Sequence, residues 1–508
     1  MEKTERVAAS SPAAQQSGGA DGTTAVSQQQ AQQTAVSLQH PQHPQPPESL
    51  SAPAAAPAAA ATAAAPAPAA AATAAAATAA AAAATTSNAP TAPSAPKAPK
   101  KKRYLFVLLA AMGPGVIAEL AGNDAGGIST FSVAGASYGY AALWTIPIAM
   151  IFLMIVQESA ARLGAQTGKG FAALIRENFG IRLAAFAMMA LLIANTGTSL
   201  SEFAGVAAGA ELFGVNKYIS VPVAGLAVWA LIMGGTYKRI EKIFMVISLV
   251  FLTYVAAAFL SEPDWGDVAV STVVPQIVFD KSFFALIIAL IGTTIAPWMI
   301  FFGQSNVVEK GVSIKNLVLQ RVDVISGAVV ACLVVWFIII TTGTVLYSQG
   351  IVVVDAESAA NALAPIVGVY AKQLFGIGLV GASFLAACIL PLTTSYAICE
   401  AFGWERGVDR SWSEAPAFKG IFTFIIIISC VIVLLPGINL MSIMLIAQFV
   451  NGILLPVLLV FLIRLINNKR LMGQYRNRLF ANVLSNLTIV VVAVLTAILL
   501  VMQILGIG

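Results

Sequence analysis

Apolar and polar residues divide this chain into two parts at about residue 103. Residues 104–508 contain repeated stretches of about 20 apolar residues, separated by short polar segments. Each stretch can cross the hydrocarbon core of a bilayer, which is about 30 Å thick. The pattern predicts an all-α polytopic membrane protein with about eleven transmembrane helices, at 105–133, 139–162, 182–207, 219–236, 241–261, 282–303, 322–347, 372–399, 418–436, 439–464 and 481–505.

Residues 1–103 have a different composition. Gln and Ser are frequent up to residue 50, and Ala, Pro, Thr and Ser make up nearly all of residues 52–96. Such a segment cannot bury enough apolar surface to offset the entropy of ordering it. We therefore expect residues 1–103 to form a disordered cytoplasmic tail and residues 104–508 to form a transmembrane domain. The basic stretch 97–103 ends the tail and is expected to lie against anionic lipid.

The positions of the basic residues predict the orientation. If the N-terminus is inside, only Lys217, Lys281 and Lys372 among the 28 Lys and Arg residues face outward. Cytoplasmic loops of membrane proteins carry such an excess of Lys and Arg. We therefore expect an integral plasma-membrane protein with its N-terminus in the cytoplasm and its C-terminus outside. The net charge of +5 then reflects this topology and does not indicate nucleic-acid binding.

The composition also disfavours several other functions. Only 10% of the residues are charged, against about 25% in average soluble domains. Both histidines, His40 and His43, lie in the tail, and no loop is long enough for a soluble domain, so we do not expect an enzyme or a receptor. No cofactor and no obligate protein partner is indicated. The cysteines all lie in predicted spans or at an inner end, where disulfides are not expected: Cys332, Cys388, Cys399 and Cys430.

Polar and small residues interrupt the first predicted span. Glu119 lies inside it, and Asn123, Asp124, Gly126 and Gly127 follow. A carboxylate at the centre of a spanning helix costs roughly 2.5–3.5 kcal/mol on insertion scales, so Asp124 needs a partner. The two glycines would allow the backbone to leave the helix and expose carbonyl groups. An acid beside unwound backbone at membrane depth predicts a cation site.

The sixth predicted span carries a second interruption, at Gly292-Thr-Thr-Ile-Ala296-Pro297-Trp298. Pro297 lacks an N–H and clashes with the preceding turn, which frees carbonyls near Thr293. Two ordinary kinks are the alternative interpretation. Interruptions five spans apart, one of them beside an acid, favour two inverted five-helix repeats of the LeuT type, with broken helices 1 and 6 and the site between them.

Motifs around these breaks resemble the NRAMP family of divalent-metal transporters over about residues 104–475. Gly113-Pro-Gly-Val-Ile-Ala118 followed by Asp124 matches the family's first-helix pattern. The resemblance implies a transporter that works by alternating access of the two repeats. Further segments of family type are Ala134-Gly-Ala-Ser-Tyr-Gly139, Gln157-Glu-Ser-Ala-Ala-Arg-Leu-Gly164, the stretch from Gln448 to Pro456, and Asn468-Lys-Arg-Leu-Met-Gly473.

The chain also departs from the family pattern. Gly127 stands where the family has Asn, and Ala296-Pro297-Trp298 where it has Met-Pro-His. Ser199 stands where the third helix often has Asp, three residues before Glu202. These departures resemble the NRAMP-related magnesium transporters, in which the ion site is wider and proton coupling is lost. Without the thioether, a preference for softer transition metals is not expected. A roomier, all-oxygen site suits Mg²⁺, which dehydrates reluctantly.

The resemblance further implies which residues hold the metal. From the residues alone, Gln448 and Asn123 could instead form helix–helix hydrogen bonds. Glu158 is expected to be structural and to pair with Arg162 four residues later. The implied ion site consists of the Asp124 carboxylate, the carbonyls of Ala121 and Thr293, the Gln448 amide and Asn123, with Gly127 and Ala296 widening it and Glu119, Glu202 and Trp298 as candidates for the pathway.

We therefore expect uptake of Mg²⁺ and Mn²⁺ without proton coupling, driven by the membrane potential, with the ions and the lipid bilayer as the only partners. The potential contributes about 2.3 kcal/mol per charge per 100 mV, or roughly 4.6 kcal/mol for a dication. That supports more than about a thousandfold accumulation. One alternative is a proton-coupled Mn²⁺/Fe²⁺ importer that tolerates Ala296 and Trp298. Another is a sodium-coupled amino-acid carrier with broken helices, which would not need Asp124.

Overall fold

The structure, a computed structural model, describes residues 123–234, 249–309, 311–312, 314 and 317–505. The predicted tail, Glu119, Ala121, most of the first predicted span and residues 241–248 of the fifth lie outside these residues. Within them the chain is all-helical, with no strand. The helices are α3 (Ala125–Tyr138), α4 (Thr145–Thr167), α5 (Phe171–Glu211), α6 (Lys217–Met233), α8 (Thr253–Leu260), α9 (Trp265–Val273), α10 (Lys281–Thr294), α11 (Pro297–Glu309), α12 (Leu317–Val345), α13 (Ala356–Ala360), α14 (Ala364–Val367), α15 (Ala371–Phe402), α16 (Pro416–Leu434), α17 (Leu440–Ile466), α18 (Lys469–Met472) and α19 (Leu479–Leu505).

Within the described residues, 8 helical segments are long and apolar enough to cross a membrane, and the α10–α11 pair counts as one of them. The 17-residue α6 is shorter but apolar. Each predicted span that lies wholly in the described part of the chain contains a helix at or near the expected place. The chain is therefore an integral membrane protein with several spans. The count of eleven and the inverted repeats stay predictions.

Most predicted boundaries lie close to those of the structure, with two differences. The third span starts just after Gly180, close to the predicted residue 182, and a short helix from Phe171, which was not predicted, joins it in α5 across a kink at Gly180 (φ 82°). The second helix begins at Thr145 rather than 139, since α3 ends at Gly139 with a positive φ of 57°. Helix α9 was not predicted. Asp264 caps it by accepting hydrogen bonds from the N–H groups of Gly266 and Asp267.

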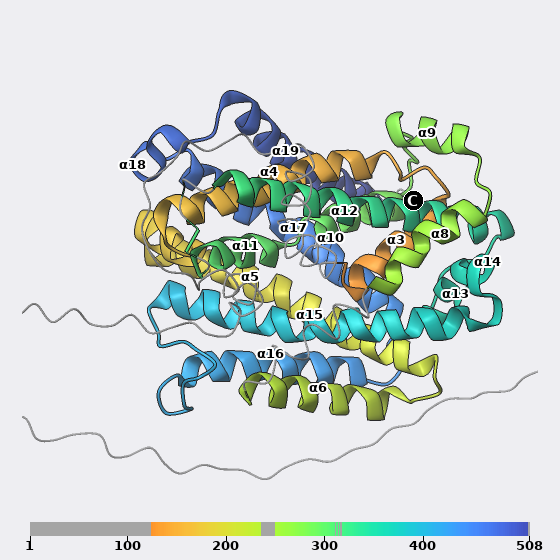
Figure 1. Cartoon of the computed structure of the whole chain (residues 1–508), viewed down its shortest axis with the longest axis horizontal. Helices are drawn as coiled ribbons and strands as arrows, with labels where there is room; N and C mark the ends of the chain where they lie inside the picture. Colours follow the sequence, from red (N-terminus) through yellow and green to blue (C-terminus); the bar gives the residue numbers. More distant parts are fainter. Residues whose placement is uncertain (1–122, 235–248, 310, 313, 315–316, 506–508) are drawn as a thin grey trace, which may run out of the picture. The chain divides into compact units, whose positions relative to one another are not determined.

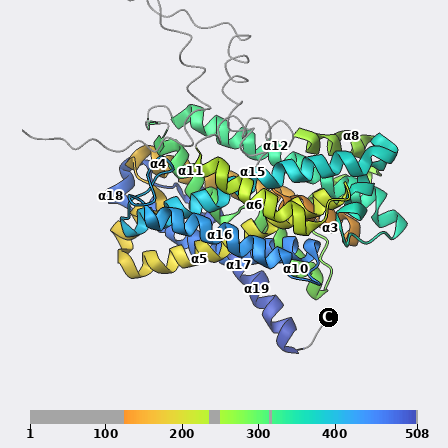
Figure 2. The same ribbon diagram turned by 90° about the horizontal axis from the view of Figure 1, so that it is seen from below.

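Helix α5 packs against both α15 and α17, and α10 packs on α17. Figure 1 shows α15, α16 and α6 running alongside each other on one side of α5, and Figure 2 shows the same group from below. Helix α12 contacts both α3 and α4. The loci that the sequence marked as interrupted, α3 and the α10–α11 junction, both contact α17.

Small residues let the central helices approach closely. A Cβ at Gly292 of α10 would lie 2.3 Å from the carbonyl oxygen of Gln448 and the nitrogen of Gly452 on α17. A Cβ at Gly452 would lie 2.3 Å from the Ile288 carbonyl oxygen. Helices in a bilayer associate through such close packing, since lipid is as apolar as their side chains. The crossing brings Thr293 of α10 to the level of Gln448.

Large apolar side chains are exposed on the outer faces of several helices. Soluble proteins rarely expose contiguous apolar patches of this kind, whereas a bilayer accepts them. The exposed residues include Phe186, Met189 and Ile193 on α5, Ile219, Val223 and Leu226 on α6, Phe424, Ile427 and Val431 on α16, and Val483, Val490 and Val494 on α19.

The predicted pair between Glu158 and Arg162 is present, with a nitrogen–oxygen distance of 3.0 Å. Glu158 also pairs with Arg321 of α12 at 2.7 Å, a contact that sequence spacing could not indicate. Arg162 donates a further hydrogen bond to the carbonyl oxygen of Tyr475. Glu158 therefore joins α4 to α12, and Arg162 joins α4 to the segment before α19. No disulfide joins any of the four cysteines.

Candidate metal centre

Asp124 lies at the first of the two predicted breaks. Its backbone is extended (φ −72°, ψ 175°), and α3 begins at the next residue. Its side chain is only 3% exposed, and Oδ1 accepts a hydrogen bond of 2.7 Å from the Gly127 N–H. A carboxylate in this N-cap position is stabilised by the helix dipole and by otherwise unpaired N–H groups. The start of α3 thus lowers the free-energy cost of burying the Asp124 carboxylate in the membrane.

Gly126 and Gly127 were expected to be unwound, and this was wrong. Both lie in the first turn of α3 and are buried. They provide space instead of exposed carbonyls. A Cβ at Gly126 would lie 2.0 Å from Gln448 Nε2, and one at Gly127 would lie 2.8 Å from Thr293 Oγ1. The expected widening at Gly127 is therefore filled by the neighbouring threonine.

The second break separates α10 from α11. Helix α10 ends at Thr294, Ile295 has non-helical angles (φ −122°, ψ 67°), and α11 begins at Pro297. In a continuous helix the Thr293 carbonyl would accept from the N–H of residue 297, which proline lacks. Thr293 and Ala296 are 6% and 2% exposed. The break therefore leaves a backbone acceptor in a buried place beside α3.

Gln448 of α17 brings these two elements together. It is fully buried, and its Nε2 lies 3.5 Å from Asp124 Oδ1, although the residues are 324 positions apart. Its Oε1 accepts a hydrogen bond of 2.8 Å from Asn451 Nδ2. Asn451 also donates to Thr198 Oγ1 of α5 at 2.8 Å. The Gln448 amide thus turns its N–H₂ group toward Asp124 and its oxygen toward Asn451.

Sequence reasoning missed Asn451 and Thr198. Both are completely buried. The available signal was the spacing of Gln448 and Asn451, three residues apart inside an otherwise apolar run, which places two amides on one face of a helix.

Glu202 lies behind Asp124 rather than in an open passage. It is fully buried, and its Oε2 accepts a hydrogen bond of 3.2 Å from the Ala125 N–H at the start of α3. Its Oε1 has no hydrogen-bond partner among the described residues. Ser199, one turn earlier on α5, is buried as well, and its hydroxyl likewise has no partner in that part of the chain. Two carboxyl groups therefore approach the same helix start.

Asn123 and Trp298 line separate cavities beside α11. Asn123, which is 8% exposed, lines a cavity of about 20 Å³ together with Thr293 and Met299. Trp298, which is 7% exposed, lines a cavity of about 50 Å³, and its Nε1 has no hydrogen-bond partner among the described residues. Met299 contributes to both cavities. The sequence pattern gave no indication that this sulfur lies near the site.

No group of three or more His, Cys, Asp or Glu side chains gathers as a metal cluster within the described residues. A cation beside Asp124 would therefore depend on at most the two carboxyl groups of Asp124 and Glu202, together with amide, hydroxyl and backbone oxygens. Such a donor set favours hard divalent cations and retained water. A discontinuous helix, here α10–α11, that meets the start of another helix at a buried polar site is typical of membrane transporters.

The chain belongs to the Nramp family: the family model described as natural resistance-associated macrophage protein-like matches residues 115–502. It is 26% identical to the divalent metal cation transporter MntH of Verminephrobacter eiseniae, covering 79% of this chain and 91% of that protein. It is 29% identical to the MntH of Yersinia enterocolitica, covering 78% and 95%.

Its fold is similar to that of a solved mutant of the Eremococcus coleocola manganese transporter. The TM-score is 0.63 and the identity 20%, covering 78% of this chain and 87% of the other.

Proposed function

We propose that this protein carries divalent metal cations across the membrane, with Mg²⁺ and Mn²⁺ as substrates. The observation that carries the proposal is the buried Asp124 carboxylate at the start of α3, 3.5 Å from the Gln448 amide and beside the α10–α11 break. A buried acid with few charged neighbours and several oxygen donors suits a dication. The names of the relatives, divalent metal cation and manganese transporters, agree with this chemistry.

The proposed ligands are Asp124, Gln448, Asn123 and the carbonyl oxygens of Thr293 and Ala121, the last of which lies outside the described residues. Gln448 must rotate its amide, because its oxygen now faces Asn451 and not Asp124. The rotation would exchange a donor for an acceptor at the ion, which a cation requires. Ala296 supplies no thioether at the break, which supports a site of oxygen donors.

We place the chain in the magnesium-transporting branch and propose uncoupled transport driven by the membrane potential. The protein is proposed to lie in the plasma membrane, with its N-terminus in the cytoplasm and its C-terminus outside. Two inverted repeats would rock about the site, and the tail over residues 1–103 would not take part in transport. Ser199 and Trp298 cannot relay protons at neutral pH, which supports the lack of coupling. Asp124 and Glu202 remain the acids of the described site.

A second candidate is a proton-coupled importer of Mn²⁺ or Fe²⁺, and one observation favours it. The Met299 side chain lines the small cavity that also contains Asn123 and Thr293. A thioether there could favour softer metals even though Ala296 cannot.

The deciding experiment uses purified protein in sealed liposomes with an imposed negative-inside potential. Mn²⁺ influx is followed with and without excess Mg²⁺, together with an internal pH dye. Competition by Mg²⁺ with a flat pH trace supports the magnesium proposal. Insensitivity to Mg²⁺ with parallel acidification supports the proton-coupled importer. Absence of potential-dependent Mn²⁺ and Mg²⁺ flux would contradict both.

A further inference from the structure

Three cavities follow helix α11 in sequence and share their walls. The smallest, about 20 Å³, contains Asn123, Thr293 and Met299. The middle one, about 50 Å³, also contains Met299. The largest, about 180 Å³, shares Phe302 and Asn306 with the middle one. The shared residues lie one helical turn apart on α11, so the cavities form a series that starts beside Asp124.

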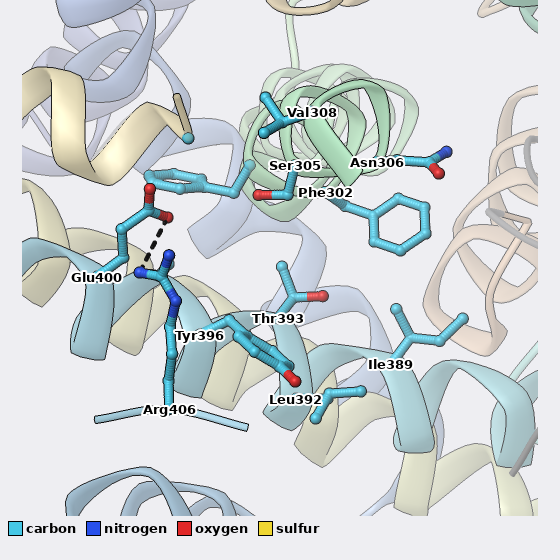
Figure 3. A pocket seen from close by; sticks show the side chains of 13 residues that line it. Phe302, Ser305, Asn306, Val308, Ile389, Leu392, Thr393, Tyr396, Glu400 and Arg406 are labelled. Atoms are coloured by element: carbon cyan, nitrogen blue, oxygen red, sulfur yellow. Dashed lines mark ion pairs between the residues drawn. The ribbon is translucent and has the colours of Figure 1, made fainter. Parts of the chain in front are cut away.

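The largest cavity opens toward the end of the series that the predicted orientation places on the cytoplasmic side. Figure 3 shows Glu400 and Arg406 on one side of it, joined as an ion pair at 3.9 Å. Phe302 and Asn306 lie on the opposite side, where they extend from α11 away from that pair. Asn306 thus stands between the large cavity and the middle one.

The middle cavity has the chemistry of a cation site. Asp323 of α12 and Gln157 of α4 line it and are 9% and 6% exposed. Gln320 and Asn306 line it as well. A carboxylate and amide oxygens are ligands that hard divalent cations accept. The negative charge that Asp323 brings to this cavity would attract a passing dication.

The size of the middle cavity and the Trp298 indole N–H in its wall indicate that water enters it. A cavity needs roughly 10–15 Å³ of accessible volume to hold one water molecule, and this one has about 50 Å³. Trp298 lines it with an indole N–H that has no hydrogen-bond partner among the described residues. Water would accept that hydrogen bond. A fully hydrated dication would not fit, so side-chain oxygens would replace part of its water shell.

We propose that Asp323, Gln157, Gln320 and Asn306 form a second, transient binding site for a partly hydrated divalent cation between the Asp124 site and the cytoplasm. The inference rests on the proposed function and deepens it. The site holds the ion after it leaves Asp124 and before it passes Asn306 into the large cavity. Two acids in series, on α3 and α12, then divide the dehydration of the ion into smaller steps.

The test measures equilibrium binding of Mn²⁺ to purified full-length protein by electron paramagnetic resonance of the unbound ion. In an Asp124→Ala background we expect one weaker site to remain. Adding Asp323→Asn should lower the Mn²⁺ affinity of this remaining site by at least about tenfold. Loss of a residue that supports a metal ligand typically lowers metal affinity by about 10–100-fold. Adding Glu177→Gln, a control at an exposed acid paired with Lys169, should change nothing.

A second variant keeps the test valid if Asp323→Asn does not fold. Gln320→Leu replaces a half-buried amide with an apolar side chain of similar size, and it should also lower the Mn²⁺ affinity of the remaining site. Loss of all Mn²⁺ binding in Asp124→Ala alone, or equal binding with and without Asp323→Asn and Gln320→Leu, overturns the inference. Such an outcome leaves the proposed function intact if the unaltered protein still transports Mn²⁺ or Mg²⁺. Absence of transport by the unaltered protein would instead contradict the proposed function.

Discussion

The start of α3 and the α10–α11 junction meet at one place but are built by different means. At the start of α3, a side chain ends the extended segment: Asp124 caps the helix, and Glu202 accepts from the next N–H. At the α10–α11 junction the residue before α11 is Ala296, whose side chain cannot cap a helix, and Pro297 removes a donor. The first break brings a negative charge into the membrane, whereas the second brings only carbonyl dipoles. A dication site needs both, because the charge attracts the ion and neutral oxygens replace its water.

The largest effect is expected from removing the charge at the first break. Asp124→Ala should lower Mn²⁺ and Mg²⁺ transport by at least about a hundredfold, which corresponds to about 2.8 kcal/mol. Asp124→Asn should transport equally little but fold better, since an Asn side chain still caps the helix. Liposome flux and thermal unfolding together check this. Near-normal flux in Asp124→Asn would mean that the charge is not what the break contributes.

At the second break the matching change is Pro297→Ala. It supplies an N–H that the Thr293 carbonyl can accept, which would close part of the interruption. We expect flux to fall by about tenfold, equivalent to about 1.4 kcal/mol, while the protein becomes more stable to heating. Unchanged flux with raised stability would show that the Thr293 carbonyl does not contribute to transport.

A substitution at Gly126 can disturb the contact between the start of α3 and α17. A Cβ there would lie 2.0 Å from Gln448 Nε2, so Gly126→Ala should displace the amide from Asp124. Overpacking of this kind costs about 1–3 kcal/mol, and flux should fall about fivefold or more. Gly197→Ala on α5 is the matched control, because its nearest neighbouring atoms are 3.9 Å away. Equal effects of the two substitutions would contradict the role given to Gly126.

A smaller and opposite effect is expected at Asn451. Asn451→Leu removes the donor that holds Gln448 Oε1 away from Asp124. The protein should lose about 1 kcal/mol of stability, while the oxygen turns more readily to the ion. Mn²⁺ affinity, measured by calorimetry, should therefore rise by about threefold. Weaker binding would indicate that Asn451 holds Gln448 in the orientation that the ion requires.

The smallest effect concerns the sulfur near the second break. If the site uses oxygen donors only, Met299→Leu should leave the ratio of Mn²⁺ to Mg²⁺ transport within about twofold, since the swap nearly conserves volume. A clear fall in the preference for Mn²⁺ would identify Met299 as a ligand and favour the proton-coupled importer.

Much of the architecture could be predicted because its signals are local. A run of about 20 apolar residues must span the bilayer or be buried, whatever surrounds it. Proline at position 297 removes the same hydrogen bond in any fold. The pair of Glu158 and Arg162 follows from helix geometry alone. The short helix before Gly180 and helix α9, which Asp264 caps, were not predicted, since they depend on small and polar residues that apolar runs do not reveal.

By itself, the sequence determined that this is a helical membrane protein of the Nramp family, with an acid at one break and a proline at another. Only the tertiary structure decided what these features face. It placed Gln448 with its N–H₂ group toward Asp124, used Gly126 and Gly127 for close approach instead of unwinding, and brought Asp323 to a cavity that follows α11. The physical reason is that periodicity assigns a residue to a helix, whereas its partners depend on how helices cross. Those crossings result from contacts between small residues far apart in the chain, such as Gly292 and Gly452.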